Sequence, residues 1–320
     1  MKRSKVLWGI KLFVALALLF VLYHELNKGD QIILAFRDAN WVNVGLCLLV
    51  LPLNFAVQWL KWRYVLKTRY PEMNNKAPFQ SLLFGSTLGL ITPGNLGELA
   101  RGLFFEGYDR LIITGLNIID KLFGMLIFIT LGILAVNYLM FAHFSWPAYI
   151  IWPVAVISLL FIVFLWLIAL NPQAVRSFLY GINTMLPARE KIKQIISCLD
   201  NFHRRQSLVM AGISLIWFIV IFIQYHLLIL AFTNVAWWKS LVAVAAVLFT
   251  KVVLPVSFGD LGIREGASVF YYLLFGVPKA AAFNASILIF VINFLIPAIS
   301  GSYFVFRLRW QNAENQDKDK

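Results

Sequence analysis

Charged side chains within or beside long apolar segments are the residues of this chain whose types and spacing could do chemistry. They lie in two glycine-rich stretches, residues 92–102 (TPGNLGELARG) and 255–266 (PVSFGDLGIREG), in the pair at residues 120–121 (DK), and at Lys251. Each charge would cost about 2.5–3.5 kcal/mol at the centre of a lone membrane helix. We therefore expect these side chains to face a protein-lined or water-filled interior and to pair with one another.

The spacing of the charges allows such pairing. Glu98 and Arg101 are three residues apart, and Asp260 and Arg264 are four apart, so each pair can meet on one helix face. Residues 120–121 are adjacent and point in different directions. Each of those two therefore needs a partner elsewhere in the chain, with the other repeat as one source.

A new helix is expected to begin just after each glycine-rich break, at Gly97 and at Gly262. Its free N–H groups and its positive dipole end would point toward the membrane midplane and favour an anion there. Glycine lets a ligand approach the backbone closely, and arginine can bind a phosphate or carboxylate bidentately. The acidic neighbours could instead hold a proton or a cation. A lipid headgroup is the most natural anionic substrate at this depth.

The candidate substrate-binding residues share a place in or beside these breaks. They are Gly94, Asn95, Gly97, Glu98, Arg101, Asp120, Lys121, Ser257, Gly259, Asp260, Gly262, Arg264 and Glu265.

The elements that must position these residues are apolar helices. The chain has 320 residues, of which 61% are hydrophobic and 13% charged, whereas a soluble domain carries roughly 25% charged residues. Runs of about 20 apolar residues are long enough to cross a hydrocarbon core of ~30 Å. Eight apolar segments occur, at about 6–23, 41–60, 78–92, 112–141, 148–170, 208–233, 239–255 and 279–306.

Two of the eight segments, 78–92 and 239–255, are short, and each runs into a glycine-containing break. If these two begin re-entrant hairpins (78–108 and 239–277), the inside loops hold 19 of the 28 Lys and Arg residues and the outside segments hold four. Eight full spans would instead place the basic loop 171–207 outside, against the positive-inside rule. The predicted fold is an all-α polytopic membrane protein with six full spans and two hairpins.

The same topology makes residues 1–310 a single transmembrane domain with an uncleaved first helix, both termini in the cytoplasm, and a disordered tail at 311–320. The hairpins would enter from opposite faces, which indicates an inverted repeat with a substrate site at its interface. Residues 187–205 are predicted to form an amphipathic helix. It either lies on the anionic inner leaflet or packs against the protein.

The composition argues against several other classes of function. The net charge of +13 lies in short loops between apolar runs, so we expect no nucleic-acid partner. The two cysteines lie in different settings, one in an apolar run and one in a basic loop, so no disulfide is expected. The four histidines show no metal-ligand spacing, and we expect no metal, no cofactor and no catalytic residue.

At these residues the chain resembles the lysylphosphatidylglycerol synthase membrane-region family, also called the flippase-like domain family. Members carry a Thr-Pro-Gly-Gly-x-Gly-Glu-like motif and a Pro-x-Ser-x-Gly-Gly-x-Gly-x-Arg-Glu-like motif, which look like residues 92–98 and 255–265 here. The family's acidic–basic pair looks like residues 120–121. The resemblance covers roughly residues 5–306 and implies a protein of the cell membrane that handles or translocates lipid.

Two departures from the family pattern matter. Asn95 and Asp260 each replace one glycine of a Gly-Gly pair, and Asp260 adds a carboxylate that could change the substrate. The stretch after residue 306 is too short for the soluble aminoacyl-transfer domain that gives the family its name. We therefore expect translocation rather than lysylphosphatidylglycerol synthesis by this chain.

Three functions remain open at this point. The first is a flippase for an anionic phospholipid or a polyprenyl-phosphate-linked lipid in cell-envelope biogenesis, with a separate lipid-modifying enzyme as a candidate partner. The second is a membrane enzyme that acts on such a lipid. The third is a scaffold that does not transport, for which charge changes at the breaks would only destabilise the protein.

Overall fold

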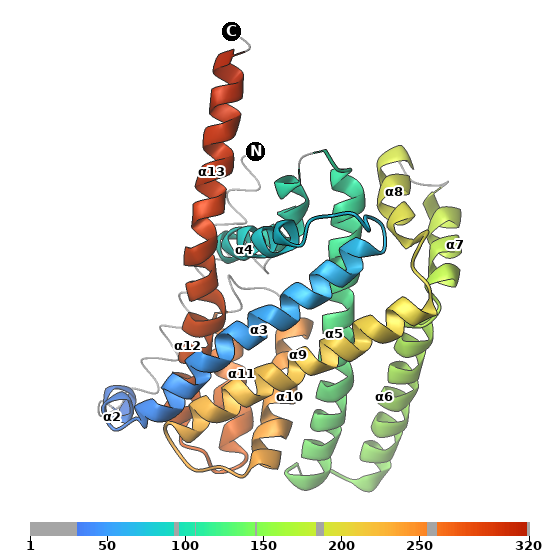
Figure 1. The fold of residues 1–320 in the computed structure, drawn as a ribbon. Helices are drawn as coiled ribbons and strands as arrows, with labels where there is room; N and C mark the ends of the chain where they lie inside the picture. Colours follow the sequence, from blue (N-terminus) through green and yellow to red (C-terminus); the bar gives the residue numbers. More distant parts are fainter. Residues whose placement is uncertain are drawn as a thin grey trace, which may run out of the picture.

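The fold was analysed in a computed structural model, which describes residues 31–92, 96–105, 107–144, 146–183, 189–254 and 261–318. No strand occurs in these ranges, and most of their residues are helical (Figure 1). The elements are α2 (Gln31–Arg37), α3 (Trp41–Lys67), α4 (Lys76–Ile91), η1 (Leu96–Phe104), α5 (Arg110–Ala142), α6 (Ala148–Ala169), α7 (Pro172–Asn183), α8 (Arg189–Ile196), η2 (Ser197–Leu199), α9 (Arg204–Leu230), α10 (Trp237–Val253), α11 (Ile263–Leu273), α12 (Lys279–Phe290), η3 (Val291–Leu295) and α13 (Ile296–Lys318).

Within the described residues, five helices are long and apolar enough to cross a membrane: α3, α5, α6, α9 and the continuous helix Lys279–Arg307 formed by α12, η3 and most of α13. They correspond to five of the six predicted full spans. The remaining predicted span, 6–23, lies outside the described residues. The two short segments predicted as hairpin arms form α4 and α10, of 16 and 17 residues.

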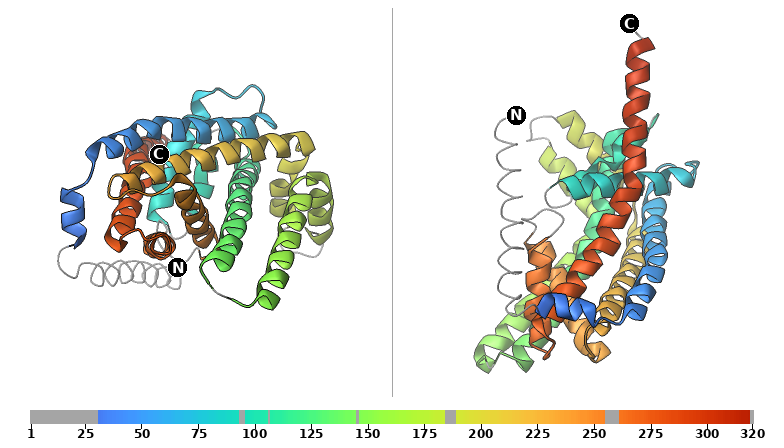
Figure 2. Two further views of the ribbon diagram at one scale, coloured as in Figure 1. Left: turned by 90° about the horizontal axis from the view of Figure 1, so that it is seen from below. Right: turned by 90° about the vertical axis from the view of Figure 1, so that its left-hand side faces the viewer.

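Two helices are broken: the first consists of α4 and η1, and the second of α10 and α11. These two broken helices lie toward opposite ends of the bundle. α4 packs against η1, and α10 packs against α11. In Figure 1 the first pair lies in the upper part of the molecule, near the projecting end of α13, while the second pair lies in the lower part. α3 and α9 lie side by side along one face in both views of Figure 2.

Two hydrophobic clusters form the core. The larger one joins α9, α10, α11 and α12 with the second half of α5, and includes Leu228, Val244 and Tyr272. The smaller one joins α4, η2 and the first half of α5 with the end of α3, and includes Trp62 and Leu116. Each broken helix thus packs in its own cluster, and α3, α5 and α9 connect the two.

The segment between α6 and α9 differs from its prediction. The predicted helix 187–205 is divided into α8 and η2, and Arg204 already begins the spanning helix α9. Ile196, Leu199 and Phe202 of its apolar side are buried, which agrees with the packing alternative rather than with a free surface helix. A further helix, α7, precedes it, and α13 continues to Lys318 into the tail for which the sequence predicts disorder. That tail contains neither Gly nor Pro to end the helix.

Candidate functional site

The first broken helix is held together by glycines that let η1 lie directly on α4. A Cβ at Gly85 would stand 2.5 Å from Cγ of Arg101, and one at Gly89 would stand 2.7 Å from Cγ of Glu98. The Gly97 N–H donates a 2.5 Å hydrogen bond to Oγ1 of Thr92. Glycine at the two α4 positions therefore creates the space that the charged side chains of η1 occupy.

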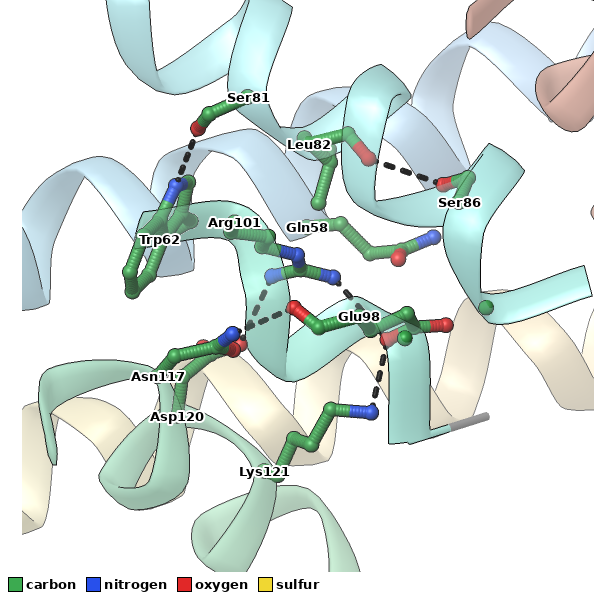
Figure 3. Close-up of polar contacts among 12 residues, drawn as sticks. Gln58, Trp62, Ser81, Leu82, Ser86, Glu98, Arg101, Asn117, Asp120 and Lys121 are labelled. Atoms are coloured by element: carbon green, nitrogen blue, oxygen red, sulfur yellow. Dashed lines mark hydrogen bonds and ion pairs between the residues drawn. The ribbon is translucent and has the colours of Figure 1, made fainter. Parts of the chain in front are cut away.

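A network of ion pairs connects η1 to α5 (Figure 3), and Lys61 extends it from α5 to α3. Arg101 contacts Glu98 at 3.1 Å and Asp120 at 3.5 Å. Lys121 contacts Glu98 at 2.8 Å, and Lys61 contacts Asp120 at 3.4 Å. Each carboxylate is thus shared by two cations, which is the pairing that buried charges require.

Neighbouring groups fix the orientation of this network. The Asn117 side chain donates a 2.6 Å hydrogen bond to the backbone oxygen of Glu98. The guanidinium of Arg101 lies 5.6 Å from the centre of the Trp62 ring, whose N–H donates to Ser81 at 2.8 Å. Arg101 is 4% exposed, so its charge is stabilised by these partners and not by solvent.

The second broken helix restarts at Gly262, whose φ of 86° favours glycine. The Gly262 N–H donates a 2.6 Å hydrogen bond to a carboxylate oxygen of Glu265, as in a capping box. The other oxygen of Glu265 accepts a hydrogen bond from Arg264 and also forms an ion pair with it. Ser286 of α12 contacts both Arg264 (3.2 Å) and Glu265 (3.3 Å). Both charged side chains are almost completely buried.

A π-helical turn, η3, places an aromatic ring between two cations. The ring centre of Phe294 lies 4.8 Å from the Lys251 ammonium and 5.7 Å from the Arg264 guanidinium. Pro297 has no N–H to donate to the carbonyl of Asn293 four residues earlier, so the regular helix is interrupted at this turn. Such turns often occur at functional sites.

Residues of both halves line one cavity of about 220 Å³. Among the residues that the structure describes, its charged lining consists of five cations and two carboxylates: Lys61, Arg101, Lys121, Lys251, Arg264, Glu98 and Asp120. The uncharged lining includes Phe294, Trp217 and Tyr225. The two breaks therefore contribute to a single strongly cationic site, whose chemistry suits an anion.

A ladder of amides lies beside the charges. Asn54 of α3 donates to Gln224 of α9 at 2.6 Å, and Gln224 exchanges hydrogen bonds with Asn293 at 3.0 and 2.8 Å. Asn54 also accepts from Gln58 and from the Trp217 ring N–H. This ladder joins the π-helical turn to α3 and α9, so the polar lining extends across both halves.

The sequence of the chain is similar to that of a known family of membrane regions. The chain matches the family described as "Lysylphosphatidylglycerol synthase TM region" over residues 8–301. It belongs to that family. No curated protein and no solved structure matches the chain. Family membership gives the chain a membrane location and a lipid-related role.

Most of the predicted site residues that the structure describes lie close together. Glu98, Arg101, Asp120, Lys121 and Arg264 line the cavity, and the predicted ion pair between Glu98 and Arg101 is confirmed. Gly97, Gly262 and Glu265 are not part of the lining; Gly97 donates to Thr92, and Glu265 accepts from Gly262 and Arg264. Gly94, Asn95, Ser257, Gly259 and Asp260 lie outside the described residues.

One detail of the prediction is wrong and another is confirmed. The N–H groups of Gly97 and Gly262 are not free for a ligand, because Thr92 and Glu265 accept their hydrogen bonds. These two backbone amides are therefore not available to an anion. Residues 120–121 each have a partner elsewhere in the chain, as predicted. Within the described residues these partners come from α3 and η1 of the same half, and none of these ion pairs crosses to the other repeat.

Sequence reasoning missed Lys61, which was assigned to an inside loop. α3 continues through Lys67, and Lys61 is 4% exposed in the cavity wall. A signal was present, because Asn54, Gln58 and Lys61 follow one another at helical spacing on an otherwise apolar helix. Lys251 was recognised as an intramembrane charge but was not included among the site residues.

Proposed function

We propose that this chain is a lipid flippase that binds an anionic lipid headgroup in the cavity and moves it between the two leaflets. The observation that carries the proposal is that charged side chains of both halves, Lys61, Arg101 and Lys121 from one and Lys251 and Arg264 from the other, line one cavity among apolar helices. Charges in such surroundings are costly and are typical of substrate pathways. The family's lipid-related role agrees with this reading.

The size of the cavity supports a headgroup as its occupant. Its volume of about 220 Å³ is below the ~300–1,000 Å³ of pockets that enclose drug-sized ligands. A whole lipid would not fit. The headgroup enters among the cations, while the acyl or prenyl tails stay against exposed apolar side chains such as Leu122 and Met125, which belong to α5 beside Lys121.

The arrangement of the broken helices suits alternating access. We place α4–η1 and α10–α11 as re-entrant hairpins that enter from opposite membrane faces, as in an inverted repeat. The end of the bundle with α7 and α8 carries a basic loop, so we assign it and both termini to the cytoplasmic side of the cell membrane. The proposal makes the hairpin interface the substrate site.

Exchange of ion-pair partners supplies the two states. Glu98 is shared between Arg101 and Lys121. A headgroup phosphate that binds Lys121 releases Glu98 to Arg101 alone, and Asp120 then relies on Lys61. Because the ligand replaces contacts between η1 and α5, its binding biases how these two elements sit relative to each other.

In this proposal the lipid is moved without chemical change, as part of cell-envelope lipid biogenesis, and no cofactor is used. Its substrate class is an anionic phospholipid or a polyprenyl-phosphate-linked lipid. A separate lipid-modifying enzyme is a partner that could supply or consume the translocated lipid.

The test is lipid translocation in vesicles that contain the purified protein. Fluorescently labelled phosphatidylglycerol that reaches the inner leaflet escapes a membrane-impermeant quencher, which gives a rate. We expect Lys121→Gln to lower the rate at least tenfold, since Glu98 keeps Arg101 as a partner and the fold survives. Lys239→Gln has the same charge change away from the cavity and is the control. Equal rates in protein-containing and empty vesicles would refute the flippase proposal.

A further inference from the structure

The short helix α7 turns its long polar side chains toward the protein. Its one charged side chain, Arg176, forms a 2.8 Å ion pair with Asp200, the residue that follows η2. Tyr180 donates to the same carboxylate at 3.4 Å. The Gln173 side chain donates to the backbone oxygen of Phe202 at 2.9 Å. These polar groups are therefore used on the side of α7 that faces η2 and the start of α9.

The opposite face of α7 is exposed and carries no charge. It consists of five residues at helical spacing: Ala174, Ser177, Phe178, Gly181 and Ile182. Phe178 is 67% exposed and Ile182 is 38% exposed. A helix that lies against a protein in water normally directs its charged and long polar side chains outward. The outward face of α7 therefore suits an apolar environment.

The position of α7 in the chain brings this face to a membrane surface. The spanning helix α6 ends at Ala169 and the spanning helix α9 begins at Arg204, so the segment between them starts and ends at one end of the bundle. Only residues 170–171 separate α6 from α7, and both helices lie at the same edge of the molecule (Figure 1). Phe164 and Leu167 of α6 are 57% and 58% exposed. The apolar surface that faces lipid along α6 thus continues toward α7.

The dimensions of a bilayer agree with this placement. Phe178 follows Pro172, the first residue of α7, by six positions, which is at most ~9 Å along a helix. The headgroup layer of each leaflet is about 5–8 Å thick, and amphipathic surface helices bury their apolar face about 5–10 Å deep. The Phe178 ring is therefore within reach of the boundary between headgroups and acyl chains.

We infer that α7 is a membrane-surface anchor, whose outward face enters the lipid leaflet at the basic end of the bundle. Its binding partner is the bilayer surface itself, which replaces water around the face that contains Phe178. The inference goes beyond the proposed function and does not depend on lipid transport.

The anchor would act on the cavity through the segment that follows it. A Cβ at Gly115 of α5 would stand 2.6 Å from the backbone oxygen of Ile195 and 2.8 Å from Sγ of Cys198. The end of α8 and η2 therefore pack directly on the helix that carries residues 120–121 of the cavity wall. Attachment of α7 to the leaflet holds this half of the cavity at a fixed depth in the membrane.

Nitroxide labels on single introduced cysteines test the inference in vesicles of equal parts phosphatidylcholine and phosphatidylglycerol. Both native cysteines are buried, and the labelled wild-type protein gives their background. Phe178→Cys is compared with Leu160→Cys, which is 63% exposed on α6, and with Glu72→Cys in the exposed turn between α3 and α4. Collisions of the label with oxygen, which concentrates in the bilayer, and with a water-soluble nickel chelate report its depth.

We expect the ratio of oxygen to nickel-chelate collisions to be several-fold higher at residue 178 than at residue 72, and shifted toward the ratio at residue 160. A ratio equal to that at residue 72 places the face in water and overturns the inference. Low collision rates with both reagents show that protein covers the face, which overturns it as well. Ala174→Cys, on the same face, answers the question if Phe178→Cys does not fold.

A second variant tests the role of Phe178 itself. With the label at Ala174→Cys, Phe178→Asp is expected to lower the collision ratio several-fold, because a charge is costly at the depth given to this ring. Phe178→Leu, which keeps an apolar side chain, should leave the ratio unchanged. An unchanged ratio in folded Phe178→Asp contradicts the anchoring role of Phe178.

Discussion

Removal of Arg264 should destabilise the protein through the carboxylate that it leaves behind. Arg264 is 2% exposed and Glu265 0%, so Arg264→Ala strands a buried negative charge. Breaking a buried pair costs about 3–5 kcal/mol. Gly262 and Ser286 still donate to Glu265, which places the expected loss near the lower end, about 3 kcal/mol.

A double-mutant cycle separates this electrostatic effect from lost packing. Glu265→Gln removes the charge but keeps an oxygen that can accept from Gly262. We expect Arg264→Ala with Glu265→Gln to be at least ~1.5 kcal/mol more stable than Arg264→Ala alone, because an interacting pair is non-additive by about 0.5–3 kcal/mol. Unfolding by SDS in mixed micelles, followed by circular dichroism, gives the free energies.

A partly exposed ion pair elsewhere in the chain is the control for this prediction. Arg176 and Asp200 form a 2.8 Å ion pair whose side chains are 37% and 30% exposed. Arg176→Ala should cost only about 0–1 kcal/mol, as surface pairs do. Strict additivity at Arg264 and Glu265, or equal costs for Arg176→Ala and Arg264→Ala, would show that the buried pair is not what stabilises the second break.

Three further changes test the way the cavity is built. Gly85→Ala and Gly89→Ala should each lower thermal stability by about 1–3 kcal/mol through overpacking against Arg101 and Glu98, whereas Gly45→Ala and Gly212→Ala, where a Cβ meets nothing within 4 Å, should be neutral or stabilising. Asn293→Leu should cost about 1–3 kcal/mol, because it leaves buried Gln224 without two of its hydrogen bonds; a neutral result in the same unfolding assay would contradict the importance of the amide ladder. Pro297→Ala should restore a regular helix, withdraw Phe294 from Lys251 and Arg264, and lower several-fold the amount of anionic lipid that native mass spectrometry detects on the protein. An unchanged amount would argue against a functional π-helical turn.

The long apolar runs made most of the fold predictable. A run of 20 or more apolar residues has few alternatives to a spanning helix, and five such runs became the five long helices. The charges inside apolar segments also predicted most of the charged lining of the cavity, because an isolated charge in such a segment is too costly to be incidental. The pair formed by Glu98 and Arg101 followed from helical spacing alone.

The remaining features depend on contacts that local sequence does not specify. Lys61 lies near the end of an apolar run, where a basic residue usually marks a loop, yet its partner Asp120 comes from α5. The N–H of Gly97 is satisfied by Thr92 across the break, which helix periodicity cannot show. To predict the π-helical turn η3, one would have had to notice that Pro297 has no N–H for the carbonyl of Asn293, four residues earlier.

The central claim, that the cationic cavity holds an anionic lipid, is tested most directly by native mass spectrometry of the gently purified protein. Wild-type protein would be compared with Lys121→Gln/Lys251→Gln, and with Lys191→Gln/Lys193→Gln on α8 as a control with the same charge change away from the cavity lining. We predict that an anionic lipid is retained by the wild type and the control and is lost from the folded cavity variant. Identical lipid profiles in all three proteins would contradict the account.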